Sequence, residues 1–177
     1  MKRPTPFLLR RALGLLLALL AWPALTQQAQ PARYNVEIVV FRAVDESPAS
    51  ENPPASGASA DIAATPVTAG KLSDAASRLR ASGAYRVLGQ AAWTQVPAPW
   101  NSGRGVSLGQ IGLGNGLSGS VILERGQYLH LGFDLQYTEG GRHWVINELR
   151  RVKVNERQYY DHPALGVIAI VTPAGGN

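Results

Sequence analysis

Two adjacent arginines, Arg150 and Arg151, and the segment QYYDHP at residues 158–163 are the parts of this chain best suited to binding an anionic ligand. Successive side chains of a strand point to opposite faces, so the arginines, with Lys153, would place positive charge on both faces. A guanidinium fork matches a carboxylate, and Tyr and Trp rings stack on sugar rings. This combination is typical of a surface that holds a carboxylate-rich, sugar-containing polymer.

A structural interpretation of the same segment is also open. Asp161 can accept hydrogen bonds from backbone N–H groups ahead of it, and Pro163 fixes the chain before the last apolar stretch. The segment would then be an ordered turn with a buried contact between Asp161 and an arginine. The two interpretations are compatible, because a turn can also carry ligand-binding side chains.

Other kinds of chemistry find little support in the residue pattern. His130, His143 and His162 lack the HExxH or HxH spacing that brings metal ligands together. The GxGxxG string at residues 114–119 leads into a β-rich run and not into a helix, so it predicts a glycine-rich loop and not a dinucleotide site. No serine lies in a GxSxG elbow. We therefore predict no enzyme activity, no cofactor and no metal.

The elements that must position these residues are mostly strands. Alternating and β-branched apolar residues predict strands at residues 34–41, 85–96, 105–111 (weaker), 117–125, 127–138, 143–154 and 166–172. The segments 117–125 and 127–138 could be two arms or one long bent strand. Helical spacing over 71–82, followed by Gly83, predicts one principal helix. The fold class predicted is α+β: a mostly antiparallel sheet with this helix packed on it.

The composition of the chain divides it into two consecutive parts, and the second part contains an insertion. Residues 1–30 combine basic residues, an apolar run and a small-residue stretch, as in a secretory signal peptide. Residues 31–177 are expected to form a single domain. Within it, the Pro-, Ser-, Ala- and Gly-rich stretch at about 45–70 is expected to be a flexible insertion, because it offers little apolar surface to bury.

Charge and cysteine content exclude several protein classes. Lys2, Arg3, Arg10 and Arg11 belong to the predicted signal peptide, and without them 13 Lys and Arg face 12 Asp and Glu. Such a balance argues against a nucleic-acid-binding surface. The apolar run is interrupted too early for a stable membrane anchor, and the absence of cysteine excludes disulfides and lipoprotein attachment. The sequence therefore predicts an exported protein without a membrane anchor.

Four segments in this order resemble the CsiV family of periplasmic peptidoglycan-binding proteins: YNVEIVVFR (34–42), YRVLGQAAWTQ (85–95), GQYLHLGFDL (126–135) and ELRRVKVNERQYYDHPALGVIAIVTP (148–173). The paired arginines ahead of the DHP turn carry much of the resemblance. From the family pattern we expect histidine at the positions of Gln90 and Gln158 and arginine at the position of Gln127, so this chain has fewer basic groups there.

The resemblance implies a non-enzymatic periplasmic protein that binds peptidoglycan and supports cell-wall assembly and cell shape. It also implies, as a partner, an outer-membrane lipoprotein activator of a class A penicillin-binding protein. The alternative is a periplasmic protein-interaction module that acts on wall-synthesis machinery without binding the polymer, for example by capturing a partner strand on an exposed sheet edge.

The candidate ligand-binding residues are basic or aromatic and lie in the matching segments. They are Arg150, Arg151, Trp93, Trp144, Tyr128 and Tyr160. We expect these side chains to gather on one surface that binds carboxylates and amino sugars.

Overall fold

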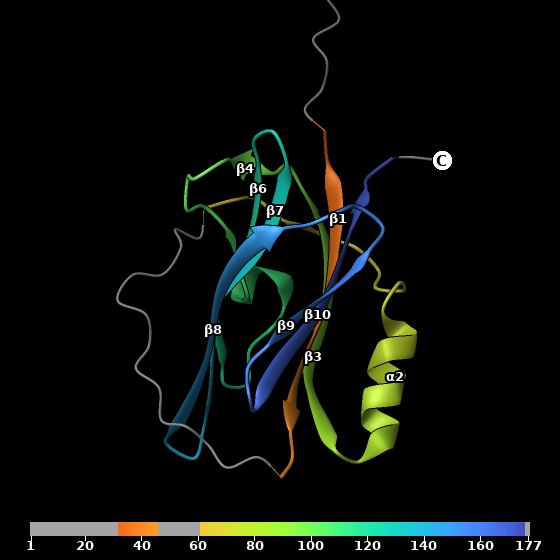
Figure 1. The fold of residues 1–177 in the computed structure, drawn as a ribbon, viewed down its shortest axis with the longest axis vertical. Helices are drawn as coiled ribbons and strands as arrows, with labels where there is room; N and C mark the ends of the chain where they lie inside the picture. The colour runs from red at the N-terminus through yellow and green to blue at the C-terminus, as the bar shows by residue number, and fades with distance from the viewer. Residues whose placement is uncertain (1–31, 46–60, 176–177) are drawn as a thin grey trace, which may run out of the picture. The chain divides into compact units, whose positions relative to one another are not determined.

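The computed structural model describes residues 32–45 and 61–175, and within them it contains two five-stranded sheets and one α-helix (Figure 1). The predicted signal peptide at 1–30 and residues 46–60 of the predicted insertion lie outside the described residues. The prediction of a mostly antiparallel α+β fold is confirmed, but the division into two sheets was not predicted. No helix in the described part of the chain is long and apolar enough to cross a membrane.

The first sheet is entirely antiparallel and has the order β2-β3-β1-β10-β9. Its strands are β1 Tyr34–Ala43, β2 Thr65–Pro66, β3 Tyr85–Gln95, β9 Arg157–Asp161 and β10 Leu165–Pro173. The strand β1 occupies the middle of the sheet because it is apolar on both faces, and Ile38 and Val39 are both fully buried. β10 lies between β1 and β9, which confirms the prediction of an interior strand at 166–172.

The second sheet has the order β4-β6-β7-β8, with β5 also paired to β6. Its strands are β4 Ala98–Pro99, β5 Val106–Ser107, β6 Leu117–Arg125, β7 Leu129–Glu139 and β8 Arg142–Arg151. Only the short β4 runs parallel to its neighbour. β6 and β7 are two separate antiparallel strands, which decides between the two interpretations of this region.

Two sequence predictions concern the chain that leads into β6. The strand predicted at 105–111 is wrong in its second half, because Gly109–Ile111 forms the 3-10 turn η2 and the chain reverses at Gly112 in the left-handed region. The glycine-rich loop predicted at 114–119 is confirmed only at 114–116, because β6 begins at Leu117; the segment leads into a strand and not into a helix. Gly119 has φ of 108°, and a Cβ there would lie 1.9 Å from the carbonyl oxygen of Asp134.

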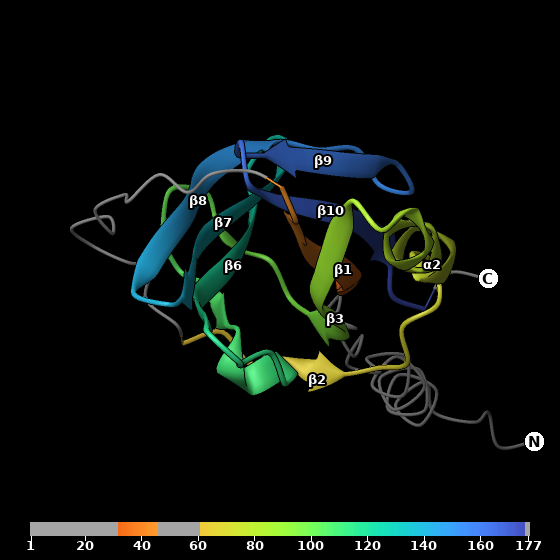
Figure 2. The same cartoon turned by 90° about the horizontal axis from the view of Figure 1, so that it is seen from below.

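The main hydrophobic core lies between the two sheets (Figure 2). Every second residue of β1, β10, β6 and β7 points into it, as period-two alternation requires. Fully buried members from the first sheet include Val36, Trp93 and Val167, and those from the second sheet include Leu131 and Leu135. The outward-facing positions of the second sheet are therefore free to carry polar and ligand-binding side chains.

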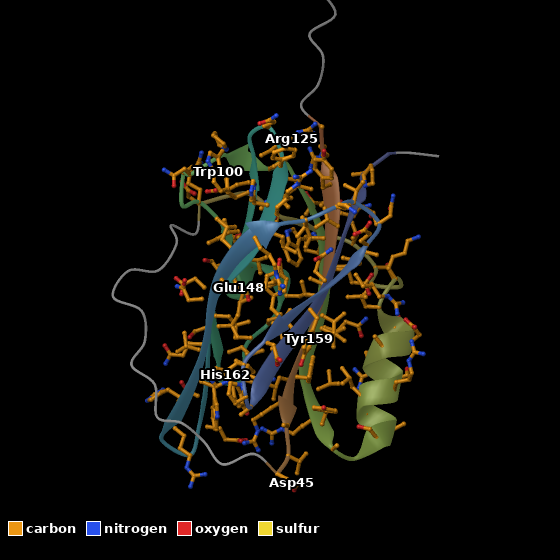
Figure 3. All side chains as sticks on the ribbon, viewed as in Figure 1. Asp45, Trp100, Arg125, Glu148, Tyr159 and His162 are labelled. Atoms are coloured by element: carbon orange, nitrogen blue, oxygen red, sulfur yellow. The ribbon has the colours of Figure 1, made fainter. Side chains whose placement is uncertain are left out.

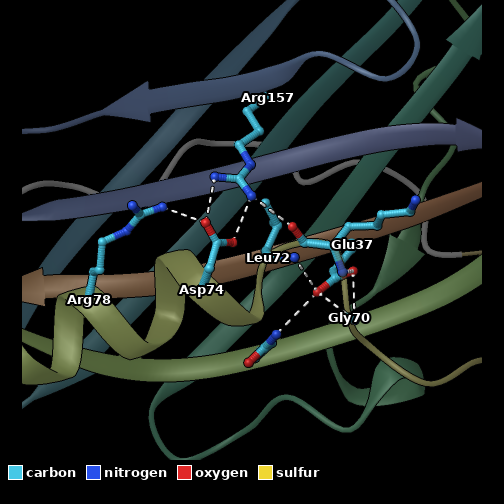
Figure 4. Close-up of polar contacts among 8 residues, drawn as sticks. Glu37, Gly70, Leu72, Asp74, Arg78 and Arg157 are labelled. Atoms are coloured by element: carbon cyan, nitrogen blue, oxygen red, sulfur yellow. Dashed lines mark hydrogen bonds and ion pairs between the residues drawn. The ribbon is translucent and has the colours of Figure 1, made fainter.

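The helix α2, Ser73–Ser82, ends at Gly83 in the left-handed conformation, as predicted from the sequence. Leu72 and Ala76 share a second buried cluster with Val39 of β1 and Ile170 of β10, on the side of the first sheet away from the main core. In Figure 4, Asp74 near the start of the helix contacts both Arg78 and Arg157.

A buried carboxylate fixes the chain just before α2. Glu37 of β1 is 5% exposed, and its carboxylate accepts hydrogen bonds from the backbone N–H groups of Gly70, Lys71 and Leu72 and from Nε2 of Gln90, at 2.8–3.1 Å (Figure 4). Buried charge is tolerated because each oxygen has donors.

The range predicted for the flexible insertion, about 45–70, therefore extends too far at its C-terminal end. Thr65 and Pro66 pair with Thr94 and Trp93 of β3, and Gly70 is bonded to Glu37. The physical reason is that this stretch is held by its backbone hydrogen bonds, which a pattern of apolar side chains does not report.

An ion cluster links the two sheets at one end. Arg86 of β3 donates hydrogen bonds to the carboxylate of Glu139 and the hydroxyl of Tyr137, both on β7, and Arg42 of β1 lies 3.5 Å from the same carboxylate. The hydrogen bond from Arg86 is the main cause that holds the pKa of Glu139 below its ordinary value.

A lowered pKa makes the contribution of Glu139 to stability depend on pH. The carboxylate stabilises the fold above its unfolded-state pKa of about 4.3, and this stabilisation is lost as the pH falls through the lower folded-state pKa. We expect Glu139→Gln to reduce the free energy of unfolding at neutral pH and to differ little from wild type in acid, as measured by urea denaturation across this range. A difference that stays constant with pH would contradict this role.

Candidate functional site

Aromatic and basic side chains gather at one end of the outward face of the second sheet. His130 of β7 lies directly opposite Arg151 of β8 in the antiparallel register. The ring of Trp100, which follows β4, lies 4.0 Å from the ring of His130, and the Arg151 guanidinium carbon lies 3.5 Å from the centre of the Tyr128 ring. We call Trp100, Tyr128, His130 and Arg151 the Trp100 surface; Figure 3 labels Trp100 at this end, near Arg125.

The loop that carries Trp100 is held by a second buried carboxylate. Glu124 of β6 is 1% exposed and accepts hydrogen bonds from Asn101 N at 2.9 Å, Gly103 N at 2.8 Å and Ser102 Oγ at 3.1 Å. These contacts stabilise the turn that contains Trp100, which the hydrogen bond from Ser102 N to the Pro99 carbonyl closes. The backbone that carries Trp100 is therefore held in place, and the indole itself is 50% exposed.

Gly126, in the turn between β6 and β7, allows the tryptophan to approach. A Cβ at position 126 would lie 3.0 Å from the Cβ of Trp100, closer than nearly all real contacts of this kind. The approach brings Trp100 over His130, whose Nδ1 is buried. The result is two pairs, Trp100 with His130 and Arg151 with Tyr128, which the register of β7 and β8 places next to each other.

The Trp100 surface carries positive charge without a neighbouring accessible carboxylate. Arg151 makes no ion pair with any of the described residues, whereas Arg42, Arg86 and Arg150 all do. Glu124 lies opposite His130 in the register of β6 and β7, but its carboxylate is buried against the loop 101–103. The guanidinium of Arg151 is therefore available to bind an external anion.

Three of the six candidate residues lie in the main core, which corrects the sequence-based selection. Trp93, Trp144 and Tyr160 are 0%, 1% and 0% exposed. The Trp93 Nε1 donates to Gln95 Oε1, and the Tyr160 hydroxyl donates to the Leu131 carbonyl at 2.7 Å. Burial raises the pKa of Tyr160 to about 12, so this hydroxyl remains a donor. Buried rings cannot stack on a polymer, and these three residues stabilise the fold.

Arg150 is engaged within the protein and lies on the opposite face of β8 from Arg151. Its guanidinium carbon lies 4.0 Å from the centre of the Tyr160 ring, and the guanidinium also contacts the carboxylate of Glu148 at 3.2 Å and donates to the Tyr159 carbonyl. The prediction that the two arginines point to opposite faces is consistent with these contacts. Of the six predicted residues, the Trp100 surface contains only Arg151 and Tyr128, while Arg150 contacts the buried Tyr160.

Most of the segment predicted as a turn at 158–163 is strand, because β9 runs to Asp161 and the chain bends only at 162–164 before β10. A buried Asp–Arg contact does not hold it. Asp161 is exposed and accepts a hydrogen bond from the Tyr159 hydroxyl at 2.9 Å, and His162 N donates to the Leu165 carbonyl. The predicted contact is wrong because Arg157, the arginine nearest in sequence to Asp161, pairs with Asp74, and Arg150 contacts Tyr159, Tyr160 and Glu148.

Sequence reasoning missed Trp100 and His130. Trp100 follows the Pro97-Ala98-Pro99 break, where no periodicity assigns it to a surface, and His130 was considered only as a metal ligand. A large aromatic residue in a proline-containing loop is a usable sequence signal of an exposed ring, because loops run over the protein surface. Within the described part of the chain, no three His, Asp or Glu side chains are grouped as metal ligands.

Comparison with known proteins supplies the family. The family model described as "Peptidoglycan-binding protein, CsiV" matches residues 55–174, which include the whole second sheet and all of the first sheet except β1. No curated protein and no solved structure matches the chain. Because the family model covers more than half of the sequence, the chain belongs to the CsiV family of peptidoglycan-binding proteins.

Proposed function

We propose that this protein binds peptidoglycan through the Trp100 surface. The observation that carries the proposal is the juxtaposition of a half-exposed tryptophan with an arginine that has no ion pair in the described residues. Aromatic faces stack on the apolar faces of sugar rings, and arginine binds carboxylates with a bidentate fork. The wall polymer offers both kinds of group, and the family description agrees with this ligand.

The proposed role is binding and not catalysis. Glycoside hydrolysis uses carboxyl groups aimed at the polymer, whereas Glu124, the carboxylate opposite His130 in the strand register, is buried and bonded to the loop. We expect long incubation of the protein with sacculi to release no soluble muropeptides. Release that increases with protein concentration would favour a hydrolase.

The direct test is sedimentation with purified, protein-free sacculi. We expect the exported protein to pellet with sacculi and to remain in solution without them. A protein that stays in the supernatant at all sacculus concentrations would contradict the proposed function. Protein-free sacculi are required, because crude envelopes also offer protein partners.

We further propose that the chain is exported by residues 1–30, remains in the periplasm, and supports wall assembly and cell shape there. An outer-membrane lipoprotein activator of a class A penicillin-binding protein is the proposed partner. Cell fractionation tests the location, and crosslinking in living cells tests the partner. Recovery of the intact polypeptide from the cytosol would contradict both proposals.

A second candidate function is a protein-interaction module. A hollow of about 350 Å³ lies beside α2, lined by residues that include Leu79, Tyr85 and Ile168, and Tyr85 is 40% exposed. Capture of a partner strand by the edge strand β9 is disfavoured, because Arg150 already occupies the carbonyl of Tyr159. Co-sedimentation with crude envelopes but not with purified sacculi would favour this candidate.

A further inference from the structure

We infer that Arg151 binds a carboxylate carried on, or next to, the sugar ring that stacks on Trp100, so that the Trp100 surface selects acidic amino sugars over neutral ones. The inference rests on the proposed polymer binding and specifies what part of the polymer is recognised. It differs from general attraction to an anionic polymer, because it assigns the selectivity to one named guanidinium on the same surface as one named ring.

The first argument is the spacing of the groups. His130 and Arg151 are opposite each other on adjacent antiparallel strands, where paired positions are about 5 Å apart. Trp100 lies 4.0 Å from His130, ring to ring. The indole and the Arg151 side chain therefore belong to the two neighbouring pairs Trp100–His130 and Arg151–Tyr128, which the strand register places side by side. Only a carboxylate close to the stacked ring can use both groups at once.

The second argument is that Arg151 is prepared for an anion. Its guanidinium carbon lies 3.5 Å from the centre of the Tyr128 ring, which is a stacking distance, and Tyr128 is 42% exposed. Stacking holds the planar group by one face and leaves its N–H donors available at the edge. A group that is already oriented loses less conformational entropy when it binds.

The third argument is the contrast with Arg150, the neighbour of Arg151 on β8. Arg150 contacts the carboxylate of Glu148. Arg151 has no such partner among residues 32–45 and 61–175. The only acidic position in its row, Glu124, is bonded to the loop of Trp100. By holding that loop, Glu124 acts as a positioning residue and keeps its own charge away from Arg151.

The wall polymer has two sources of such a carboxylate. One is the lactyl group on muramic acid, which is free where the stem peptide has been removed, and the other is the stem peptide itself. The lactyl carboxylate is attached to the sugar ring, whereas the peptide carboxylates lie farther along the chain. Both sources share the chemistry of a carboxylate beside an N-acetylated sugar.

The test uses sacculi whose carboxylates have been blocked with carbodiimide and methylamine, compared with untreated sacculi. We expect at least about tenfold weaker retention on blocked sacculi, because a charge-assisted hydrogen bond contributes about 1.5–3 kcal/mol. In the same assay, Arg151→Gln should bind untreated and blocked sacculi equally. Its retention on either should be as weak as that of the wild type on blocked sacculi. Arg151→Lys should keep only part of the preference, because lysine lacks the planar fork.

A matched control removes the same charge elsewhere. Arg80→Gln, on the exposed side of α2, should keep the wild-type preference for untreated sacculi. Soluble glycan strands stripped of peptide, and soluble stem peptide, serve as competitors that distinguish the two sources of carboxylate.

The outcomes separate the inference from the proposed function. Equal retention of wild type on blocked and untreated sacculi overturns the inference and leaves peptidoglycan binding in place. A preference that survives in Arg151→Gln, or disappears in Arg80→Gln, also overturns it. Absence of wild-type binding to untreated sacculi contradicts the proposed function, and the inference fails with it.

Discussion

Replacing Trp100 with alanine should weaken retention on sacculi by about 30-fold, the largest effect that we expect on binding. Truncation of a central aromatic residue at a binding surface costs about 2 kcal/mol or more, and each 1.4 kcal/mol is a factor of ten. Trp100 is the largest exposed ring of the Trp100 surface and contacts His130. Sedimentation over a range of sacculus concentrations measures the change as a shift in half-saturation.

The matched control for this variant is Tyr85→Ala. Tyr85 is also an exposed aromatic residue at 40%, but it belongs to β3 of the first sheet and contacts Phe41. We expect its removal to leave retention nearly unchanged. If both variants weaken binding equally, or if Trp100→Ala binds like wild type while its far-ultraviolet circular dichroism is unaltered, the Trp100 surface is not the polymer site.

The largest effect on stability is expected for Glu37→Ala. This change leaves three backbone N–H groups and the Gln90 amide without their acceptor at a buried position. Unsatisfied buried donors cost about 1–3 kcal/mol each, and partial hydration lowers the sum, so we expect a loss of about 3 kcal/mol. Thermal unfolding should show this as a decrease of about 6–12 °C in Tm.

Two further variants test the cause of this destabilisation. Glu37→Gln keeps one acceptor oxygen and should be intermediate. Glu156→Ala removes an exposed carboxylate that pairs with Lys153 and should change the free energy of unfolding by less than about 1 kcal/mol. Equal stability of Glu37→Ala and Glu156→Ala would show that Glu37 does not anchor the chain before α2.

Local patterns in the sequence predicted the elements well where one physical signal dominates. The alternation of Leu129, Leu131, Phe133 and Leu135 corresponds to β7, and the helical spacing that ends at Gly83 corresponds to α2. Both signals depend only on neighbours along the chain. The division of the strands between two sheets depends on which faces meet across the core, and no local pattern encodes that choice.

The candidate site was only partly predictable for the same reason. Residue type identified Arg151 and Tyr128, but it also selected Trp93, Trp144 and Tyr160, since a large aromatic ring suits a core as well as a ligand. Strand alternation could separate Arg150 from Arg151 but could not say which face was outward. No sequence signal identifies the roles of Glu37 and Glu124, because a carboxylate that binds backbone N–H groups has the same sequence appearance as a solvated one.

The position of β1 in the first sheet has a consequence for how the chain folds. β1 pairs on one side with β3 and on the other with β10, the last strand of the described residues, so that Tyr34 lies opposite Pro173. Contacts between residues this distant in sequence give a high contact order, which is associated with slow folding. The first sheet cannot be completed until β10 is available to pair with β1. A polypeptide that lacks β10 would expose both β1 and β9 as unpaired edges prone to aggregation.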